Sequence, residues 1–251
     1  MYTDTEGIIL RQTKTVNGRR MLTLFSLKYG KISAGTGINE RGRGKNALAM
    51  RPFTHGRYEL FKSRDTYNIN GAEVIHSYYG IGEDVDKYMT CAYILEFTEK
   101  LLPEEQPVPQ LFYLLAEFFS VMEKRKNRFE TLVIAYQLKA LSICGHQPVL
   151  DGCVHCGSKE TAVLFDIKEG GLVCADCAQK YPSNNPNVSL IYEINFGIVN
   201  ILRYFLNNPL SGFEKLALDP PLEKLLRAMI KDYIGYHLDL GPLKSEGFLP
   251  M

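Results

Sequence analysis

The stretch CVHCGSKETAVLFDIKEGGLVCADC, residues 153–177, places two Cys-x-x-Cys pairs on either side of a 17-residue spacer. This spacing falls within the Cys-x2-Cys-x(15–20)-Cys-x2-Cys template of a tetrahedral structural zinc site. Thiolates are soft donors that suit zinc, and each Cys-x-x-Cys turn lets two sulfurs face one ion. Because four protein ligands fill the coordination shell, the sequence predicts one structural zinc rather than a catalytic one. The predicted ligands are Cys153, Cys156, Cys174 and Cys177.

Other interpretations of the cysteines are weaker. A redox Cys-x-x-Cys needs a thioredoxin-like strand and helix around it, and that setting is absent. His155 or Asp176 could replace a thiolate, but the set of four sulfurs needs no substitute. The remaining cysteines, Cys91 and Cys144, fall inside apolar helical patterns, so the distribution favours metal binding over disulfides. The element is also not basic enough to be the main phosphate-binding surface.

Composition and charge exclude several classes of protein. The 251 residues are 45% hydrophobic and 23% charged, which is ordinary globular composition. No apolar run is long enough for a membrane span, and the first residues lack the features of a signal peptide, so a cytoplasmic protein without membrane contact is expected. Residues 1–80 hold 13 Lys and Arg against 6 Asp and Glu, whereas residues 81–251 hold 16 against 22. The basic first part is typical of a module that binds a polyanion.

The first 75 residues show the two-residue period of strands. Five short runs are separated by turn signals such as Asn17-Gly18 and Tyr29-Gly30. Their number predicts a small closed barrel, and both the OB-fold and an SH3-like barrel agree with the pattern. The predicted strands are residues 6–13, 19–28, 30–38, 56–63 and 66–75.

From Asp84 the apolar period changes to that of helices. Five apolar stripes follow, at residues 85–95, 108–122, 129–140, 194–205 and 222–234. The chain is therefore predicted to be an α+β multidomain protein, with a β-barrel followed by an α-helical domain that carries an inserted zinc ribbon-like element. The predicted parts are a DNA-binding barrel at 1–80, a first helical part at 81–150, the zinc insertion at 151–182 and a second helical part at 183–251.

Basic residues of the barrel and of its longest loop are the candidate DNA contacts. Cations interleaved with glycines in residues 39–51 would place guanidinium groups and backbone amides where phosphates can reach them. Aromatic residues of the same region could stack on bases, although most of them must fill the barrel core. The predicted DNA-binding residues are Arg19, Arg20, Lys31, Arg41, Arg43, Lys45 and Arg51, and the aromatic candidates are Tyr29, Phe53, Tyr58, Phe61 and Tyr67.

Nothing in the sequence indicates an active site. Gly42-x-Gly44-x-x-Ala47 matches only a loose dinucleotide fingerprint, without the strand, helix and acidic residue that the fingerprint requires. The five histidines are scattered singly, and no Ser, His and Asp set stands at suggestive spacing. The sequence therefore predicts a protein that is not an enzyme.

Four segments in the same order as in a known family extend this interpretation. Residues 6–46, 48–60, 141–177 and 241–248 resemble the bacterial RecO family of DNA repair proteins across essentially the whole chain. The resemblance implies an N-terminal OB-fold, a helical domain and, where the cysteines are kept, a zinc ribbon-like insertion. It also implies that the protein binds single- and double-stranded DNA and anneals complementary strands. Its implied partners are RecR, the C-terminal tail of the single-stranded-DNA-binding protein SSB and, indirectly, RecA.

Two functional hypotheses follow. In the first, the protein is a recombination mediator in DNA repair that assists RecA loading on SSB-coated DNA together with RecR, in the bacterial cytoplasm and associated with the nucleoid. In the second, it is an adaptor that recruits SSB or RecR through its helical domain, with only incidental DNA contact.

Overall fold

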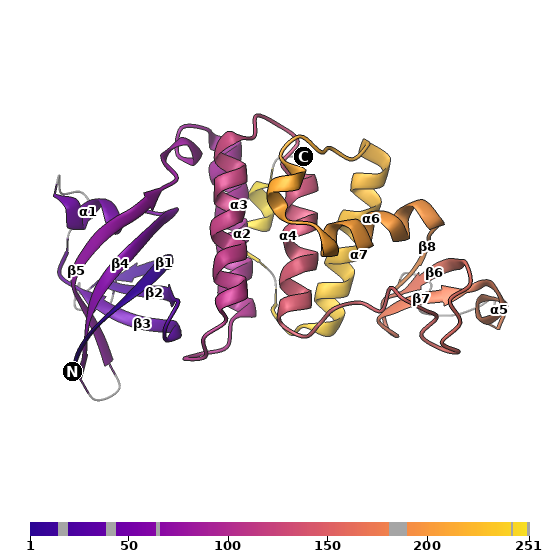
Figure 1. Cartoon of the computed structure of the whole chain (residues 1–251), viewed down its shortest axis with the longest axis horizontal. Helices are drawn as coiled ribbons and strands as arrows, with labels where there is room; N and C mark the ends of the chain where they lie inside the picture. The colour runs from indigo at the N-terminus through magenta and orange to yellow at the C-terminus, as the bar shows by residue number, and fades with distance from the viewer. Residues whose placement is uncertain (15–19, 39–43, 64–65, 181–189, 242, 250–251) are drawn as a thin grey trace. The chain divides into compact units, whose positions relative to one another are not determined.

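The computed structural model describes residues 1–14, 20–38, 44–63, 66–180, 190–241 and 243–249 (Figure 1). The chain forms two compact units, Met1–Asn127 with Pro242–Met251, and Arg128–Gly241. The first unit contains a β-barrel and the two long helices that follow it, and the second contains the later helices and the cysteine element. The domain boundaries drawn from the sequence remain predictions.

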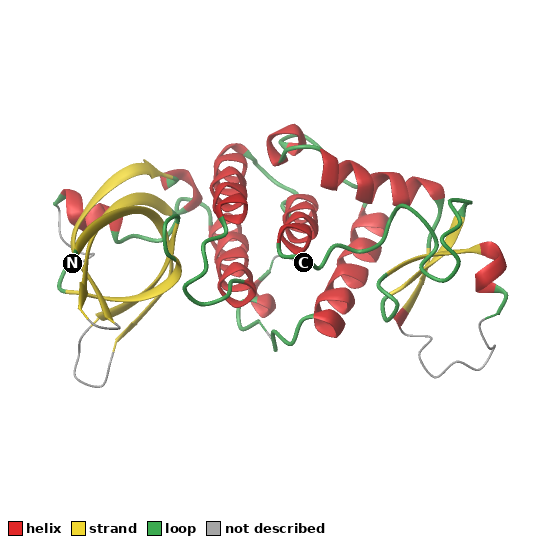
Figure 2. Cartoon of the chain, turned by 60° about the horizontal axis from the view of Figure 1, so that its bottom comes forward, coloured by secondary structure: helices red, strands yellow, loops and turns green. Residues whose placement is uncertain are grey.

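Five strands close into a barrel in the first unit (Figure 2). They pair in the order β1-β2-β3-β5-β4, with β1 and β4 closing the ring and β3 running parallel to β5. This is the strand order of an OB-fold, so the fold class is confirmed and the SH3-like alternative is wrong. The strands are β1 (Tyr2–Lys14), β2 (Arg20–Ser26), β3 (Gly30–Thr36), β4 (Thr54–Ser63) and β5 (Thr66–Ser77).

Strand β1 pairs with two strands, one on each side, and its pairing with β2 contains a shift of register. Its first half pairs with β4, its second half pairs with β2, and a shift between Ile9 and Arg11 marks the bend. Such bulges let a strand turn a barrel corner. Alternate residues of the strands point inward, and Leu24, Tyr58 and Leu60 are fully buried in the barrel core.

A short helix, α1 (Lys45–Ala49), closes one end of the barrel between β3 and β4. Ala49 packs in the barrel core, and its carbonyl oxygen accepts a 2.8 Å hydrogen bond from the Tyr58 hydroxyl. Burial raises the pKa of Tyr58, so the phenol stays a donor. The sequence analysis interpreted residues 39–51 as a loop, but part of this segment is helix α1, which closes one end of the barrel core.

Two helices pack on the barrel within the first unit. They are α2 (Val85–Leu101) and α3 (Pro109–Lys124), preceded by the 3-10 turn η1 (Tyr79–Ile81). Asp84 caps α2 by accepting a hydrogen bond from the Lys87 amide, as its position predicts. Phe112 of α3 lies edge-on to Phe25 of β2, with ring centroids 5.4 Å apart. Buried aromatic contacts of this kind join barrel and helices into one core.

Gly30, at the β2–β3 turn, is a position that no other residue suits. Its φ is +71°, and an added Cβ would lie 2.2 Å from the carbonyl oxygen of Gln106. Gly30→Ala is therefore expected to lower the free energy of unfolding by about 2 kcal/mol or more, from strain and backbone collision. Gly37→Ala is the matched control, because nothing lies within 4 Å of its added Cβ. Equal urea midpoints for the two variants would contradict this expectation.

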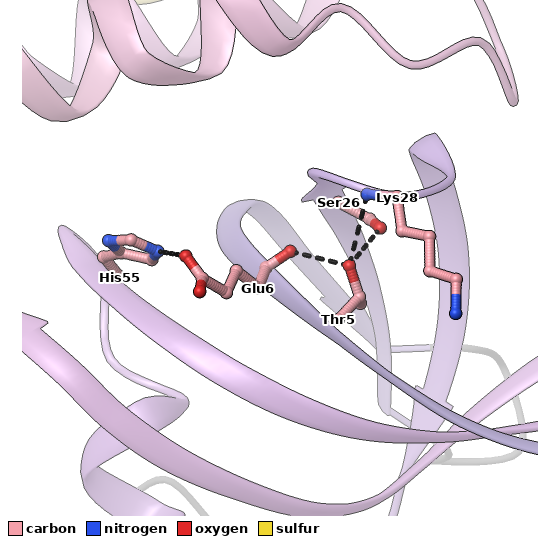
Figure 3. A network of polar contacts seen from close by, with 5 residues as sticks. All are labelled: Thr5, Glu6, Ser26, Lys28 and His55. Carbon is pink, nitrogen blue, oxygen red and sulfur yellow. Dashed lines mark hydrogen bonds and ion pairs between the residues drawn. The ribbon is translucent and has the colours of Figure 1, made fainter.

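Polar side chains link β1 to β2 and β4 in the barrel (Figure 3). The buried hydroxyls of Thr5 and Ser26 lie 2.9 Å apart, and Thr5 Oγ1 also accepts from the Lys28 amide. His55 Nε2 is 3.0 Å from a Glu6 carboxylate oxygen, and its ring lies edge-on to Phe112 at 5.2 Å. Burial lowers the pKa of His55, and the hydrogen bond with Glu6 only partly offsets it.

This environment predicts a pH effect on stability. Because the folded-state pKa of His55 lies below its unfolded value of about 6.5, neutral His55 contributes stability above that pH, and the contribution is lost as pH falls through the folded pKa. The free energy of unfolding should decrease between about pH 7.5 and 5.5, and His55→Gln should remove part of that decrease. An unaltered profile in His55→Gln would argue against this assignment.

The second unit is built around α4 (Glu130–Ile143), in which Thr131–Leu138 are all buried. A helix that is apolar on all sides belongs in a core. It packs against α6 (Phe196–Asn207), α7 (Pro220–His237) and the 3-10 turn η3 (Leu210–Phe213). Thr131 ties α4 to α7 through a 2.8 Å hydrogen bond to Glu223. The five helices predicted from the apolar stripes are therefore all present. A further 3-10 turn, η4 (Glu246–Phe248), belongs to the first unit.

Candidate functional site

The cysteine element is a three-stranded sheet with two cysteine-containing turns. Its strands are β6 (Ala162–Asp166), β7 (Gly171–Cys174) and β8 (Ile191–Glu193), in the order β7-β6-β8, and α5 (Ala175–Ala178) follows β7. The first cysteine pair precedes β6, and the second spans the end of β7 and α5. The β6–β7 hairpin therefore brings together two pairs that are far apart in the sequence.

All four predicted ligands converge on one point. The sulfur atoms of Cys153, Cys156, Cys174 and Cys177 lie within 4.8 Å of one another, and those of Cys156 and Cys174 are 3.7 Å apart. A zinc ion about 2.3 Å from each of four tetrahedral sulfurs would separate them by about 3.8 Å. The four cysteines can therefore bind a metal ion, and their geometry and chemistry are consistent with zinc.

The backbone around the first pair is folded to support a thiolate. The Gly157 amide donates to the Cys153 carbonyl at 2.8 Å, and Gly157 has a φ of +73° that completes the turn. Burial raises the pKa of Cys153, but hydrogen bonds from the amides of Cys174, Cys156 and His155 outweigh it and lower the pKa to about 6. The hydrogen bond with Cys156, together with burial, raises the pKa of Cys177. Such thiols cannot all ionise together unless a cation lies among them.

Helix α7 anchors the sheet of the cysteine element within the second unit. The Tyr192 hydroxyl of β8 donates to a carboxylate oxygen of Asp232 at 2.5 Å, and His237 Nε2 is 2.6 Å from the Ile167 carbonyl oxygen. The ring of Phe165 also contacts that of Tyr233, with centroids 6.1 Å apart. The sheet of the cysteine element is thus connected to α7 through both polar and apolar contacts.

The predicted DNA-binding residues fall into three groups. Arg19, Arg41 and Arg43 lie outside the described residues, and for Lys45 the structure describes only the backbone, at the start of α1. Arg51 is exposed immediately after α1. The other two predicted residues, Arg20 and Lys31, make contacts within the protein.

Lys31 and Arg20 brace the first unit. The Lys31 side chain is only 12% exposed, and its Nζ donates to the Glu99 carbonyl at 2.9 Å and pairs with Glu104 at 3.0 Å. The Arg20 guanidinium donates to the Ile38 carbonyl and to Gln12 Oε1, which holds β2 against the chain that leaves β3. A phosphate contact would compete with these bonds, so Lys31 in particular is poorly suited to one.

The aromatic candidates divide as the sequence predicts, with most in the core. Phe53, Tyr58 and Tyr67 are buried, whereas Tyr29 and Phe61 are half-buried. The most exposed aromatic ring of the described barrel strands belongs to Tyr2, which the sequence analysis missed. No sequence signal pointed to Tyr2, because it precedes the first predicted strand, whereas β1 begins at Tyr2 itself.

Sequence comparisons place this architecture in a family. The chain is an α+β protein of two units. Its OB barrel, its helical region and its four-cysteine element, which is a candidate metal centre, together define this class of protein. The family model for the recombination protein O N terminus matches residues 1–78, and the model for the C terminus matches residues 82–247. The chain belongs to the RecO family, and this membership supports a role in DNA repair and recombination.

Individual relatives agree with this assignment along their whole length. The protein named DNA repair protein RecO from Alkaliphilus metalliredigens is 33% identical over 240 residues, covering 95% of each chain. Proteins of the same name from Caldanaerobacter subterraneus subsp. tengcongensis and Halalkalibacterium halodurans are each 27% identical. These alignments cover 98% and 99% of this chain, and 97% and 98% of the relatives. Among the described residues, no helix is both long and apolar enough to cross a membrane.

Proposed function

We propose that this protein is a recombination mediator that binds single- and double-stranded DNA and anneals complementary strands. It assists RecA loading on SSB-coated DNA together with RecR, and it catalyses no reaction of its own. The family match over both parts of the chain carries the proposal. The surplus of cations in residues 1–80 and the OB barrel built from them support DNA binding. Such a role implies a bacterial cytoplasmic protein associated with the nucleoid.

One zinc ion per chain, held by the four cysteines, completes the proposal. Four thiolates leave no coordination position for water or substrate, so the ion supplies stability rather than chemistry. Its role is to fix the two cysteine turns against the sheet that α7 anchors.

Strand annealing on coated oligonucleotides tests the proposal. Complementary single strands are first covered with SSB, and duplex formation is followed by fluorescence energy transfer with and without the protein. The protein should accelerate annealing, and the acceleration should weaken as salt rises, because phosphate contacts release counterions. Annealing at the rate of SSB-coated strands alone would contradict the proposed function.

One observation favours the adaptor function as a second candidate. The first unit contains a groove of about 850 Å³ lined in part by apolar side chains of β1 and α2, among them Ile9, Tyr88 and Leu95. Such a groove could accept a segment of a partner such as the SSB tail. The discriminating measurement uses full-length variants that lack barrel cations, since cutting the chain near residue 80 would expose the core where Phe25 meets Phe112. Recruitment of SSB that survives the loss of DNA binding would favour the adaptor.

A further inference from the structure

Aromatic rings and lysines gather at one end of the barrel. Tyr2 is 75% exposed, and its ring lies 5.0 Å from that of Phe61 at an interplanar angle of 48°. A second ring pair, Tyr29 and Tyr67, lies 5.8 Å apart, and the Tyr29 hydroxyl is 2.7 Å from Thr3 Oγ1, next to Tyr2 in β1. The barrel therefore presents one exposed aromatic pair, whereas the second pair is largely buried.

The exposed pair is held by strand pairing. Tyr2 of β1 lies directly opposite Phe61 of β4, and opposite side chains of an antiparallel pair project from the same face. The Met1 nitrogen donates to the Lys62 carbonyl at 3.0 Å, and the Lys62 amide donates to the Met1 carbonyl at 2.9 Å. These bonds fix the backbone on both sides of the pair. A ligand that stacks here would order little of the protein, which keeps the entropic cost of binding small.

The charges around the pair are unequal. Lys62 is exposed, and its Nζ lies 4.8 Å from the centre of the Tyr67 ring. Lys28 is also exposed, with its Nζ 5.4 Å from the Tyr29 ring centre and 3.1 Å from Thr3 Oγ1. Farther along the strands, Asp4 lies opposite Glu59 and repels phosphates from that part of the face. Because successive side chains alternate between the two faces of a strand, Lys62 and the Thr3 that Lys28 contacts project from the face opposite to that of Phe61 and Tyr2.

We propose that Tyr2 and Phe61 form a stacking platform for an unpaired base of single-stranded DNA. This inference rests on the proposed function, which supplies the DNA. Phosphate contacts exist in both single strands and duplexes, whereas a base exposes its face only when it is unstacked. The platform therefore raises the affinity for single strands and leaves the affinity for duplex unchanged.

A tryptophan reporter tests stacking directly. The chain contains no tryptophan, so Tyr2→Trp introduces a single fluorophore at the platform. Saturating oligothymidine should quench its emission, because a stacked base quenches indole. Tyr113→Trp is the matched control, since Tyr113 is 57% exposed and belongs to α3 rather than to the strands that carry the platform. Unchanged emission from Tyr2→Trp on bound oligothymidine would overturn the inference.

Affinity measurements separate the platform from DNA binding in general. Tyr2→Ser should weaken binding of oligothymidine by about 5- to 150-fold, the range that one stacked base supports. The affinity of Tyr2→Ser for duplex DNA should stay within about twofold of that of the unsubstituted protein. Tyr2→Phe should bind single-stranded and duplex DNA as the unsubstituted protein does. Equal losses on single strand and duplex, or no loss on either, would refute the platform while leaving DNA binding intact. If the unsubstituted protein bound neither single-stranded nor duplex DNA, the proposed function itself would be contradicted.

Discussion

Cys174→Ser should release the metal and loosen the cysteine element, and this is the largest stability effect that we expect. The Cys174 side chain is 2% exposed, and Cys174 connects β7 to α5. Structural zinc contributes about 10–16 kcal/mol of apparent binding free energy in small zinc domains, so losing one of four thiolates should cost several kcal/mol. We expect a lowering of Tm by about 10 °C or more.

Metal analysis and amide exchange measure this effect separately. Protein purified without chelator should contain about one zinc per chain, and Cys174→Ser should contain almost none. Amides of β6 and β7 should lose protection from exchange in that variant. Cys144→Ser is the control, because Cys144 lies outside the cluster and should keep both zinc and protection. Full zinc occupancy in Cys174→Ser, or no zinc in the original chain, would contradict the site.

The cysteine cluster and the helices could be predicted from local sequence. Each Cys-x-x-Cys pair sets its own turn, so the spacing alone predicted that four sulfurs meet. The helices could also be predicted from their apolar stripes, because a period of about 3.6 residues depends only on residues that are close in the sequence. The type of barrel could not be predicted in this way, because it depends on β1 pairing with β4 and on β3 running parallel to β5. The apolar pattern of a strand does not indicate which distant strand it pairs with.

The role of single residues in the candidate DNA-binding surface could not be predicted from local sequence. Lys31 was predicted as a phosphate contact because it lies among cations, yet its hydrogen bond goes to the Glu99 carbonyl, 68 positions away. Tyr2 was missed because a single tyrosine near the first residue carries no periodic signal. In both cases the deciding partner comes from another strand or helix. Charge composition predicted a basic module but could not identify the cations, such as Lys31 and Arg20, that brace the protein.

Replacing three predicted contacts together, Arg41, Arg43 and Arg51, should remove most of the salt-dependent affinity for DNA. Each phosphate contact adds about 0.9 to the slope of log affinity against log salt for duplex, so the triple alanine variant should lower the slope by about 2 to 3. Exposed Arg51 has the freedom to make such a contact. The measurement is the affinity for one duplex at several salt concentrations between about 50 and 200 mM.

Lys31→Ala is the opposite case and serves as the matched control. Its ammonium is bonded to Glu104 and to α2, so removing it should lower the free energy of unfolding and leave the salt slope unchanged. The two variants would then separate cations that bind phosphate from cations that hold barrel and helix together. A reduced slope in Lys31→Ala with a normal slope in the triple variant would reverse the assignment. It would mean that DNA binding opens the Lys31–Glu104 pair, and that the phosphate-binding surface runs along β3 rather than through residues 41–51.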